Sequence, residues 1–313
     1  MSKVDPALQA VQQAFEGQVA RLEARLKGVI GVSIRHLESG DSVSVNGDEL
    51  FPMASTYKVA MAGAVLARVD RGELALDRMV AISQRHLDET GPIAQSVRHP
   101  GVSLSLANLI ELMLTQSNNN ATDRVLELAG GPAEVTAWLR SVGVERMSVD
   151  HSVNDLLNKF FGFPAGAAAS ASFLQRYPTS EAAEAVSGLP NPAFDDNPQD
   201  SASPRAMVEL LAVLFDGVAL TSASRAFLIE VMERCETGGA RLRGQLPAGV
   251  VVADKTGTIG GTINDAGMIT LPGDRGRLLI AVYTKKSPIL PVTSREYAIA
   301  EIARSAFDYF SIR

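Results

Sequence analysis

The chain is organised around residues 51–58, Phe51-Pro52-Met53-Ala54-Ser55-Thr56-Tyr57-Lys58, which lead directly into the apolar run Val59-Ala60-Met61-Ala62-Gly63-Ala64-Val65-Leu66. The helical spacing of apolar residues after Lys58 predicts a buried helix, and Pro52 and Ser55 are typical of a helix entry. Residues three apart share a helix face, so the Lys58 amine is expected to reach the Ser55 hydroxyl. Two interpretations of Ser55 are therefore open: it can be a catalytic serine activated by Lys58, or it can be no more than the N-cap of the helix.

The start of this predicted helix places groups that can activate the Ser55 hydroxyl beside groups that can stabilise an oxyanion. Burial disfavours the charged form of Lys58, which allows its amine to accept a proton from Ser55. The free backbone N–H groups at a helix N-terminus favour a developing oxyanion. A nucleophile, a base and oxyanion donors are thus predicted within four residues.

Composition sets the broad class. The chain has 313 residues, 46% of them hydrophobic, which is enough for one large or two modest globular domains. Its formal net charge of −6, with no basic block, argues against a nucleic-acid partner. No apolar run is long enough to span a membrane, and the first ten residues lack the apolar core of a secretion signal.

Cysteine and histidine usage argues against metals and disulfides. The single cysteine, Cys235, follows an apolar periodic run and is interpreted as a buried structural thiol. The four histidines are far apart and have no metal-ligand spacing; they are His36, His86, His99 and His151. We therefore expect neither a metal ion nor a cofactor.

Periodicity predicts helices at both ends of the chain and in its middle, and strands only near the ends. The expected helices are 6–27, the Ser55 helix to about 71–72, 104–116, 121–129, 133–141, 205–216, 222–234 and 294–310. The expected strands are 29–36, 42–45, 250–253, 264–271 and 277–284. Residues 159–200 are expected to form a long excursion with at most one or two short helices.

This order predicts an α/β sheet domain assembled from both termini, with flanking helices and an inserted helical domain. The sheet domain is expected at residues 1–51 and 208–313, and the helical domain at 52–207, with an extended loop at about 150–203. A cleft is expected between them.

Two further three-residue motifs are expected to line this cleft. Ser117-Asn118-Asn119 ends a helix and offers a hydroxyl for proton relay and amides that donate and accept. Lys255-Thr256-Gly257 ends a predicted strand and offers an ammonium and a hydroxyl for a carboxylate, with a glycine that allows close backbone approach. Taken singly, the first can be a turn and the second a strand end.

With Ser55-x-x-Lys58, these triplets resemble the signature of class A β-lactamases and related penicillin-binding serine enzymes. The resemblance covers nearly the whole chain. It implies a β-lactamase/transpeptidase-like fold with an antiparallel sheet, a β-lactam or peptidoglycan-like substrate, a periplasmic or secreted location, and we expect a monomer. Since no leader is evident, the sequence leaves open a cytoplasmic protein or a chain whose leader has been removed.

The resemblance also implies roles for individual residues. Ser55 would be the acylated nucleophile, Lys58 its base, and Ser117 the relay to the leaving nitrogen. Asn119 would bind the side-chain amide of the substrate, and Lys255 with Thr256 would bind the substrate's carboxylate. Family members without an arginine on the strand after Lys-Thr-Gly can use one just before the Lys-Thr-Gly strand as a second carboxylate anchor. Here the later position is Asn264, and Arg241 fits the earlier one. The backbone N–H groups of Ser55 and Thr258 would form the oxyanion hole.

The main departure from the family lies in the deacylation loop. Residues 153–158 resemble the family's Glu-x-x-Leu-Asn loop, which ends here at Asn158, but the glutamate position is Asn154 and the usual arginine is missing. An amide cannot act as a general base. The candidates to replace it are Asp155, Lys58 and a carboxylate from residues 159–200.

Three hypotheses follow from these observations. The first is a β-lactam hydrolase, and the second is a penicillin-binding D-alanyl-D-alanine peptidase or esterase that acylates but turns over slowly. The third, a catalytically silent binding protein, is disfavoured by the complete set of Ser55, Lys58, Ser117 and Lys255. An ordinary α/β-hydrolase is disfavoured because no Gly-x-Ser-x-Gly occurs.

Overall fold

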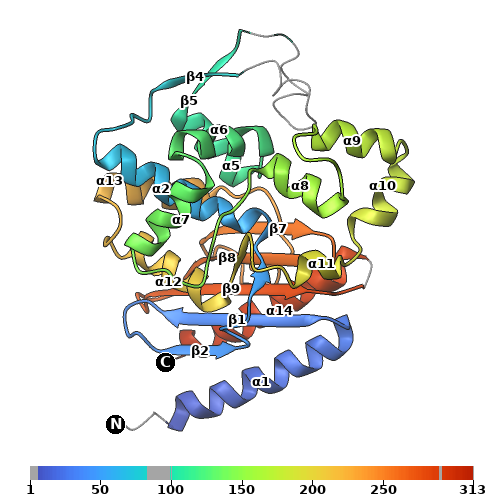
Figure 1. Cartoon of the computed structure of the whole chain (residues 1–313). Coiled ribbons are helices and arrows are strands. Elements are labelled where there is room, and N and C mark those ends of the chain that lie inside the picture. Colours follow the sequence, from blue (N-terminus) through green and yellow to red (C-terminus); the bar gives the residue numbers. More distant parts are fainter. Residues whose placement is uncertain (1–5, 83–98, 100, 289–290, 313) are drawn as a thin grey trace.

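A computed structural model describes residues 6–82, 99, 101–288 and 291–312. At its centre lies a five-stranded sheet in the order β2-β1-β9-β8-β7 (Figure 1). Its strands are β1 (Val29–His36), β2 (Ser42–Val45), β7 (Val252–Ile259), β8 (Thr262–Thr270) and β9 (Arg277–Lys285). All neighbouring strands pair antiparallel, with Val29 opposite Lys285 in the central β1–β9 pair. The mixed α/β fold with a sheet assembled from both ends of the chain is thus confirmed.

One face of the sheet is covered by the first and last helices. These are α1 (Pro6–Leu26) and α14 (Val292–Ser311), and α1 packs on β1, β2 and α14. Their apolar side chains form one buried cluster with alternate residues of the strands, such as Ile30, Val32 and Ile280. The period-2 alternation of strand side chains sends the intervening residues to the opposite face.

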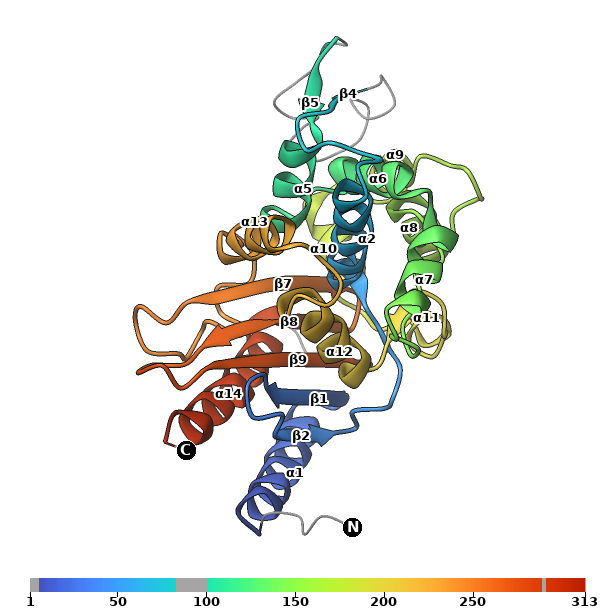
Figure 2. The same ribbon diagram turned by 90° about the vertical axis from the view of Figure 1, so that its left-hand side faces the viewer.

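The opposite face carries the helical layer (Figure 2). Helices α12 (Pro204–Phe215) and α13 (Ser222–Glu233) lie against the sheet, and above them stand α2 (Lys58–Asp70), α5 (Leu106–Thr115), α6 (Asn119–Ala129) and α7 (Pro132–Ser141). Residues 58–67 of α2 are all buried, as the apolar run after Lys58 predicts. The sheet face and the helical layer share one apolar cluster, so the predicted division at residues 51 and 207 stays a prediction.

Two short strand pairs were not expected from the sequence. β3 (Phe51–Pro52) pairs with β6 (Ser201–Ala202), and β4 (Met79–Ala81) pairs with β5 (Ser103–Ser105). Runs of two or three residues carry no periodicity, so only tertiary pairing reveals them. The β3–β6 pair brings the residues just before Ser55 beside the end of the long excursion.

The excursion contains more helix than expected, so that prediction was wrong. After α8 (Val153–Phe161) come α9 (Ala169–Arg176), α10 (Ser180–Ser187) and α11 (Pro192–Asp195). An aromatic cluster supplies the packing that the Ala/Ser-rich sequence lacks; it consists of Phe160, Phe161, Phe163, Phe173, Tyr177 and Phe194. The segment at 150–203 is therefore a small helical layer rather than an extended loop.

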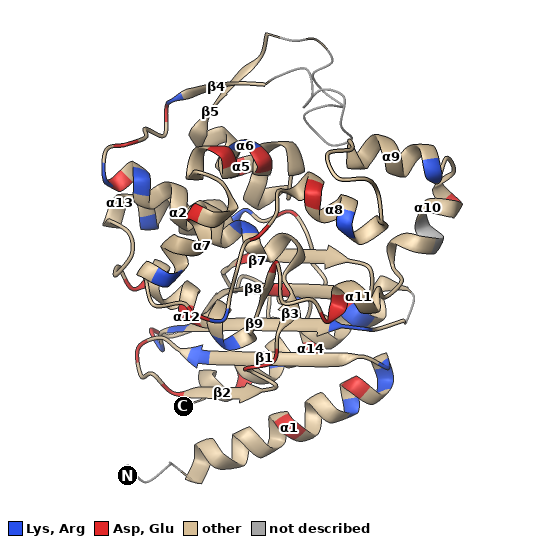
Figure 3. Cartoon of the chain, in the orientation of Figure 1, with Lys and Arg blue, Asp and Glu red and all other residues tan. Residues whose placement is uncertain are grey.

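Charges of both signs are interspersed over the sheet and the helical layer (Figure 3). No helix among the described residues combines the length and apolarity needed to cross a membrane.

Candidate active site

Three segments that lie far apart in the sequence meet at the edge of the sheet. The 3₁₀ turn Ala54–Tyr57, which continues directly into α2, packs against β7 and β8. The loop before α6 reaches the same place, because the Lys58 amine donates hydrogen bonds to Ser117 and Asn119. The structure thus brings together the three motifs that the sequence predicts.

The backbone before Ser55 is held in an unusual conformation. Ala54 has a φ of 46°, in the left-handed region that residues with a side chain rarely adopt. The Asn264 amide on β8 donates to the carbonyl oxygens of Pro52 and Met53, at 2.8 and 3.0 Å. Within the described residues no group hydrogen-bonds the Ser55 hydroxyl, which is partly exposed. The backbone before the predicted nucleophile is therefore fixed by β8, while the Ser55 hydroxyl is partly exposed.

Lys58 is completely buried beside it. Its Nζ lies 2.8 Å from the Ser117 carbonyl oxygen, 3.2 Å from the Ser117 hydroxyl and 2.9 Å from Asn119 Oδ1. Burial, followed by the charge of Lys255, lowers the pKa of Lys58 well below its usual value. A neutral amine can accept a proton, and three oxygens stand ready to hold the ammonium that results. The spacing predicted a Lys58–Ser55 contact, but the amine points toward Ser117 and Asn119 instead.

The residues of the second motif have different tasks. Ser117 has a φ of 56° and directs both its carbonyl and its hydroxyl to Lys58. Asn118 caps α6, since its Oδ1 accepts from the Ala121 N–H at 2.8 Å, while its Nδ2 is buried without a partner among the described residues. The middle residue of this motif therefore has a structural role as the N-cap of α6.

The third motif lies inside β7 rather than at its end. Lys255 is fully buried, and burial lowers its pKa to about 8. A Cβ added to Gly257 would lie 2.5 Å from the Met53 carbonyl oxygen and 3.1 Å from the Ser55 nitrogen. Only a glycine lets β7 pass this close to the backbone N–H of Ser55, which is one of the two predicted oxyanion donors. Thr258, the other donor, lies one residue on and is exposed.

Arg241 is buried behind this strand. Its Nη1 donates to the carbonyl oxygens of Gly257 and Asn264, and its Nε pairs with Glu296. Its Nη2 donates to Thr258 Oγ1 at 2.7 Å. The guanidinium is therefore bonded to the backbone of β7 and β8 and to the Thr258 hydroxyl, while Thr256 Oγ1 bonds Thr237, and the role of Arg241 as a carboxylate anchor stays a prediction.

The polar side chains of the predicted deacylation loop are bonded to neighbouring groups of the loop and of the turn that follows it. Asn154 Nδ2 donates to the Ala167 carbonyl and its Oδ1 accepts from the Ala169 N–H, at 2.9 and 2.8 Å. Asn158 Nδ2 donates to the same Ala167 carbonyl. Asp155 is exposed and its carboxylate accepts from the Ser152 hydroxyl that caps α8. The two asparagines fasten the following turn, and Asp155 completes a helix cap.

His151 and Asp200 join the two ends of the helical segment 151–200, in a loop that lacks the family's arginine. Asp200 Oδ2 lies 2.6 Å from His151 Nδ1, and Asp200 Oδ1 accepts the backbone N–H groups of Asp150 and His151. The two ends of residues 151–200 are thereby tied together. This pairing had no signal in the sequence.

Asp123 on α6 is a buried carboxylate beside the predicted deacylation loop that sequence reasoning missed. It follows Asn119 by four residues, so both lie on one face of α6. Its Oδ1 accepts from the Val153 N–H at 2.8 Å and its Oδ2 from the Asn154 N–H at 3.4 Å. Burial raises its pKa to about 6, against the opposing charge of Lys58. The i, i+4 spacing from Asn119 was the signal that could have found it.

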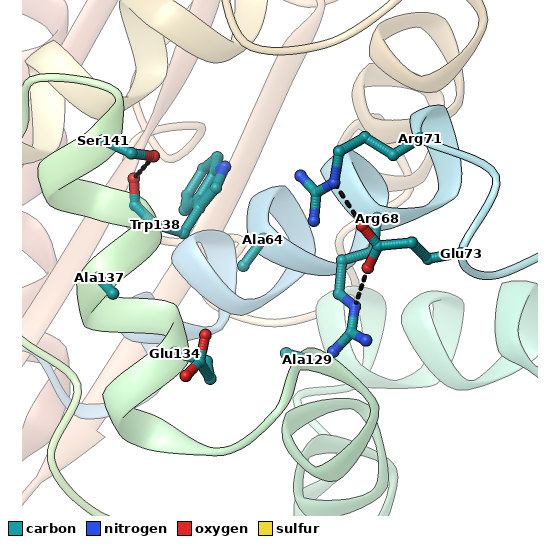
Figure 4. A pocket seen from close by; sticks show the side chains of 9 residues that line it. All are labelled: Ala64, Arg68, Arg71, Glu73, Ala129, Glu134, Ala137, Trp138 and Ser141. Carbon is teal, nitrogen blue, oxygen red and sulfur yellow. Dashed lines mark hydrogen bonds and ion pairs between the residues drawn. The ribbon is translucent and has the colours of Figure 1, made fainter.

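The pocket in Figure 4 is a different place. It has a volume of about 480 Å³ and lies between α2 and α7, where Arg68 and Arg71 both pair with Glu73. Arg68 follows Lys58 by ten residues on α2, a rise of about 15 Å. No predicted site residue lines this pocket. Among the described residues, no group of three or more His, Cys, Asp or Glu is placed to hold a metal ion, and His86 lies outside them.

Comparison with known proteins decides the family. Residues 14–310 match the model of the β-lactamase enzyme family. The chain belongs to this family. Among solved structures, the class A β-lactamase of the last common ancestor of Gram-negative bacteria shares 34% identity, with 95% of this chain and 99% of that chain covered and a TM-score of 0.78. A β-lactamase from Chitinophaga pinensis shares 31% identity, covering 94% and 98%, with a TM-score of 0.75.

The resemblance predicted from the three motifs is therefore confirmed, and the protein is a serine β-lactamase-like hydrolase.

Proposed function

We propose that this β-lactamase family member opens β-lactam rings by forming an acyl-enzyme on Ser55. The observation that carries this assignment is the position of Ser55, whose hydroxyl has no hydrogen-bond partner among the described residues, three residues before the buried Lys58, whose pKa is lowered and whose amine bonds Ser117. Lys58 takes the hydroxyl proton as Ser55 Oγ attacks the lactam carbonyl. The Ser55 N–H, beside Gly257, and the Thr258 N–H bind the oxyanion.

The remaining site residues bind the substrate and relay protons. Ser117, bonded to Lys58, passes the proton to the lactam nitrogen as the C–N bond breaks. Asn119 binds the side-chain amide of the substrate. Lys255, Thr256 and Thr258 bind its carboxylate, and Arg241 adds positive charge behind Thr258.

The second candidate is a penicillin-binding peptidase or esterase that acylates but releases its acyl group slowly. It is favoured by one observation: Asn154 has no carboxylate, and both ends of its amide are bonded within the loop. A general base contributes about 10²–10⁴-fold, so its loss would leave a long-lived adduct.

Intact-protein mass spectrometry during incubation with benzylpenicillin tests both candidates. A β-lactamase gives an adduct that forms and disappears with product release, whereas a slow acylating enzyme keeps its adduct. Ser55→Ala should give no adduct and no hydrolysis, and Lys58→Ala should be impaired to a similar degree, because residues acting as one unit are not additive. An adduct on Ser55→Ala would contradict the assignment of the nucleophile.

A further inference from the structure

Residues 153–158, the predicted deacylation loop, contain one carboxylate, that of Asp155. Asn154 is an amide with both ends bonded, and Asp155 is exposed and bonded to Ser152. Yet the backbone N–H of Asn154 itself lies 3.4 Å from a carboxylate oxygen of the neighbouring helix, that of Asp123. The position that lacks a carboxylate side chain is thus in direct contact with one from α6.

We propose that Asp123 is the proton acceptor for hydrolysis of the acyl-enzyme, in the place that residue 154 cannot fill. It lies one turn after Asn119 on the α6 face that reaches Lys58. Two backbone N–H groups from Val153 and Asn154 fix its two oxygens, which leaves other lone pairs for a water molecule. Most of the residue is buried and a part of it is exposed to solvent, which is where a water molecule would reach the carboxylate.

The charges around Asp123 suit this task. Lys58 on α2 favours its ionised form, and Asp155 on α8 opposes it. Burial, followed by the charge of Asp123, raises the pKa of the Tyr57 hydroxyl. With burial as the largest effect, the pKa of Asp123 is about 6, which is near the operating range of a general base. In return, Asp123 opposes the fall in the pKa of Lys58.

Hydrolysis by Asp123 rests on the Ser55 acyl-enzyme of the proposed function. Water adds through its oxygen to the ester carbonyl carbon, and one of its protons goes to the Asp123 carboxylate. Lys58 has passed its proton on through Ser117 during acylation and is a neutral amine, so it accepts the water's proton from Asp123. The tetrahedral intermediate then breaks its bond to Ser55 Oγ, which takes this proton from Lys58, and the product leaves as an acid that ionises in solvent.

A purely structural role is the competing explanation, because Asp123 also accepts the first N–H groups of α8. Asp123→Asn keeps the shape and an oxygen for the Val153 N–H but removes the proton acceptor. Glu127→Gln is the matched control, since Glu127 is an exposed carboxylate one turn further along α6.

The test measures acylation and deacylation separately, by rapid quench and intact-protein mass spectrometry with benzylpenicillin. Asp123→Asn should acylate within about threefold of wild type and deacylate about 10²–10⁴-fold more slowly, while Glu127→Gln keeps both rates. The wild-type deacylation rate should rise with pH through about 6 and then level off.

Two results would overturn the assignment of Asp123: wild-type deacylation that is flat across this pH range, or unchanged deacylation in Asp123→Asn. A fall in acylation equal to the fall in deacylation would instead show a structural role. If wild type forms no adduct at all, the Ser55 acyl-enzyme fails first, and that failure is distinguishable from both.

Discussion

Replacing Asp123 by asparagine is expected to change how the stability of the fold depends on pH. Burial raises the pKa of Asp123 from its usual 3.8 to about 6. A shift of this size corresponds to about 3 kcal/mol between the protonated and ionised forms. Because the side chain keeps some contact with solvent, we expect about 1–3 kcal/mol in the folded protein.

The sign follows from linkage. A carboxyl with a higher pKa in the folded than in the unfolded chain stabilises the fold below its unfolded pKa, and this contribution is lost as the pH rises through its folded pKa. Asparagine does not titrate in this range. The unfolding free energy of Asp123→Asn minus that of wild type should therefore rise by about 1–3 kcal/mol between about pH 4 and about pH 7, and stay level above.

Urea unfolding of both proteins across this pH range measures the difference, and taking a difference removes the contributions of the other buried carboxyls. Asp48→Asn serves as the control. The Arg205 guanidinium bonded to Asp48 lowers the pKa of that exposed carboxyl, so this variant should show a small change of the opposite sign. A difference for Asp123→Asn that is independent of pH, or that falls as pH rises, would refute the raised pKa.

Three further changes test other parts of the site. Gly257→Ala should slow acylation by about tenfold or more, since its Cβ would lie 2.5 Å from a backbone oxygen, whereas Gly239→Ala, whose Cβ meets no atom within 4 Å, should react like wild type in stopped-flow nitrocefin assays. Arg241→Ala should lower kcat/KM by about tenfold to a hundredfold in steady-state assays, and an unchanged kcat/KM would show that the guanidinium does not act on the substrate anchor. His151→Ala should lose its bond to Asp200 and speed limited proteolysis within residues 151–200, and cleavage at the wild-type rate would show that the pair does not close this segment.

Much of the fold and the meeting of the motifs could be predicted from local pattern. The strands Val29–His36 and Ser42–Val45 have the predicted ends, because turn residues bound short β-rich runs. Ser55, Lys58, Ser117 and Lys255 could be named because each falls in a short motif with its own chemistry. These predictions needed no knowledge of distant contacts.

The parts that could not be predicted depend on tertiary contacts. Arg241 turns inward because its acceptors are carbonyl oxygens of Gly257 and Asn264, on strands that follow it. Asp123 contacts α8, whose first residues are thirty positions away. The i, i+4 spacing places Asp123 on the face of Asn119, but it does not show the contact with α8, so only the folded chain shows which carboxylate accompanies Asn154.

The pairing of β1 with β9 has a consequence for how the protein is made. Residues 29 and 285 are neighbours in the sheet, so during synthesis β1 emerges long before its partner exists. Hydrogen bonds within an α-helix join residues four apart, so the helices between them can form turns while the ribosome is still translating. Because the turn that carries Ser55 packs against β7 and β8, a nascent chain stalled before residue 252 would contain Ser55 without the strands that support it.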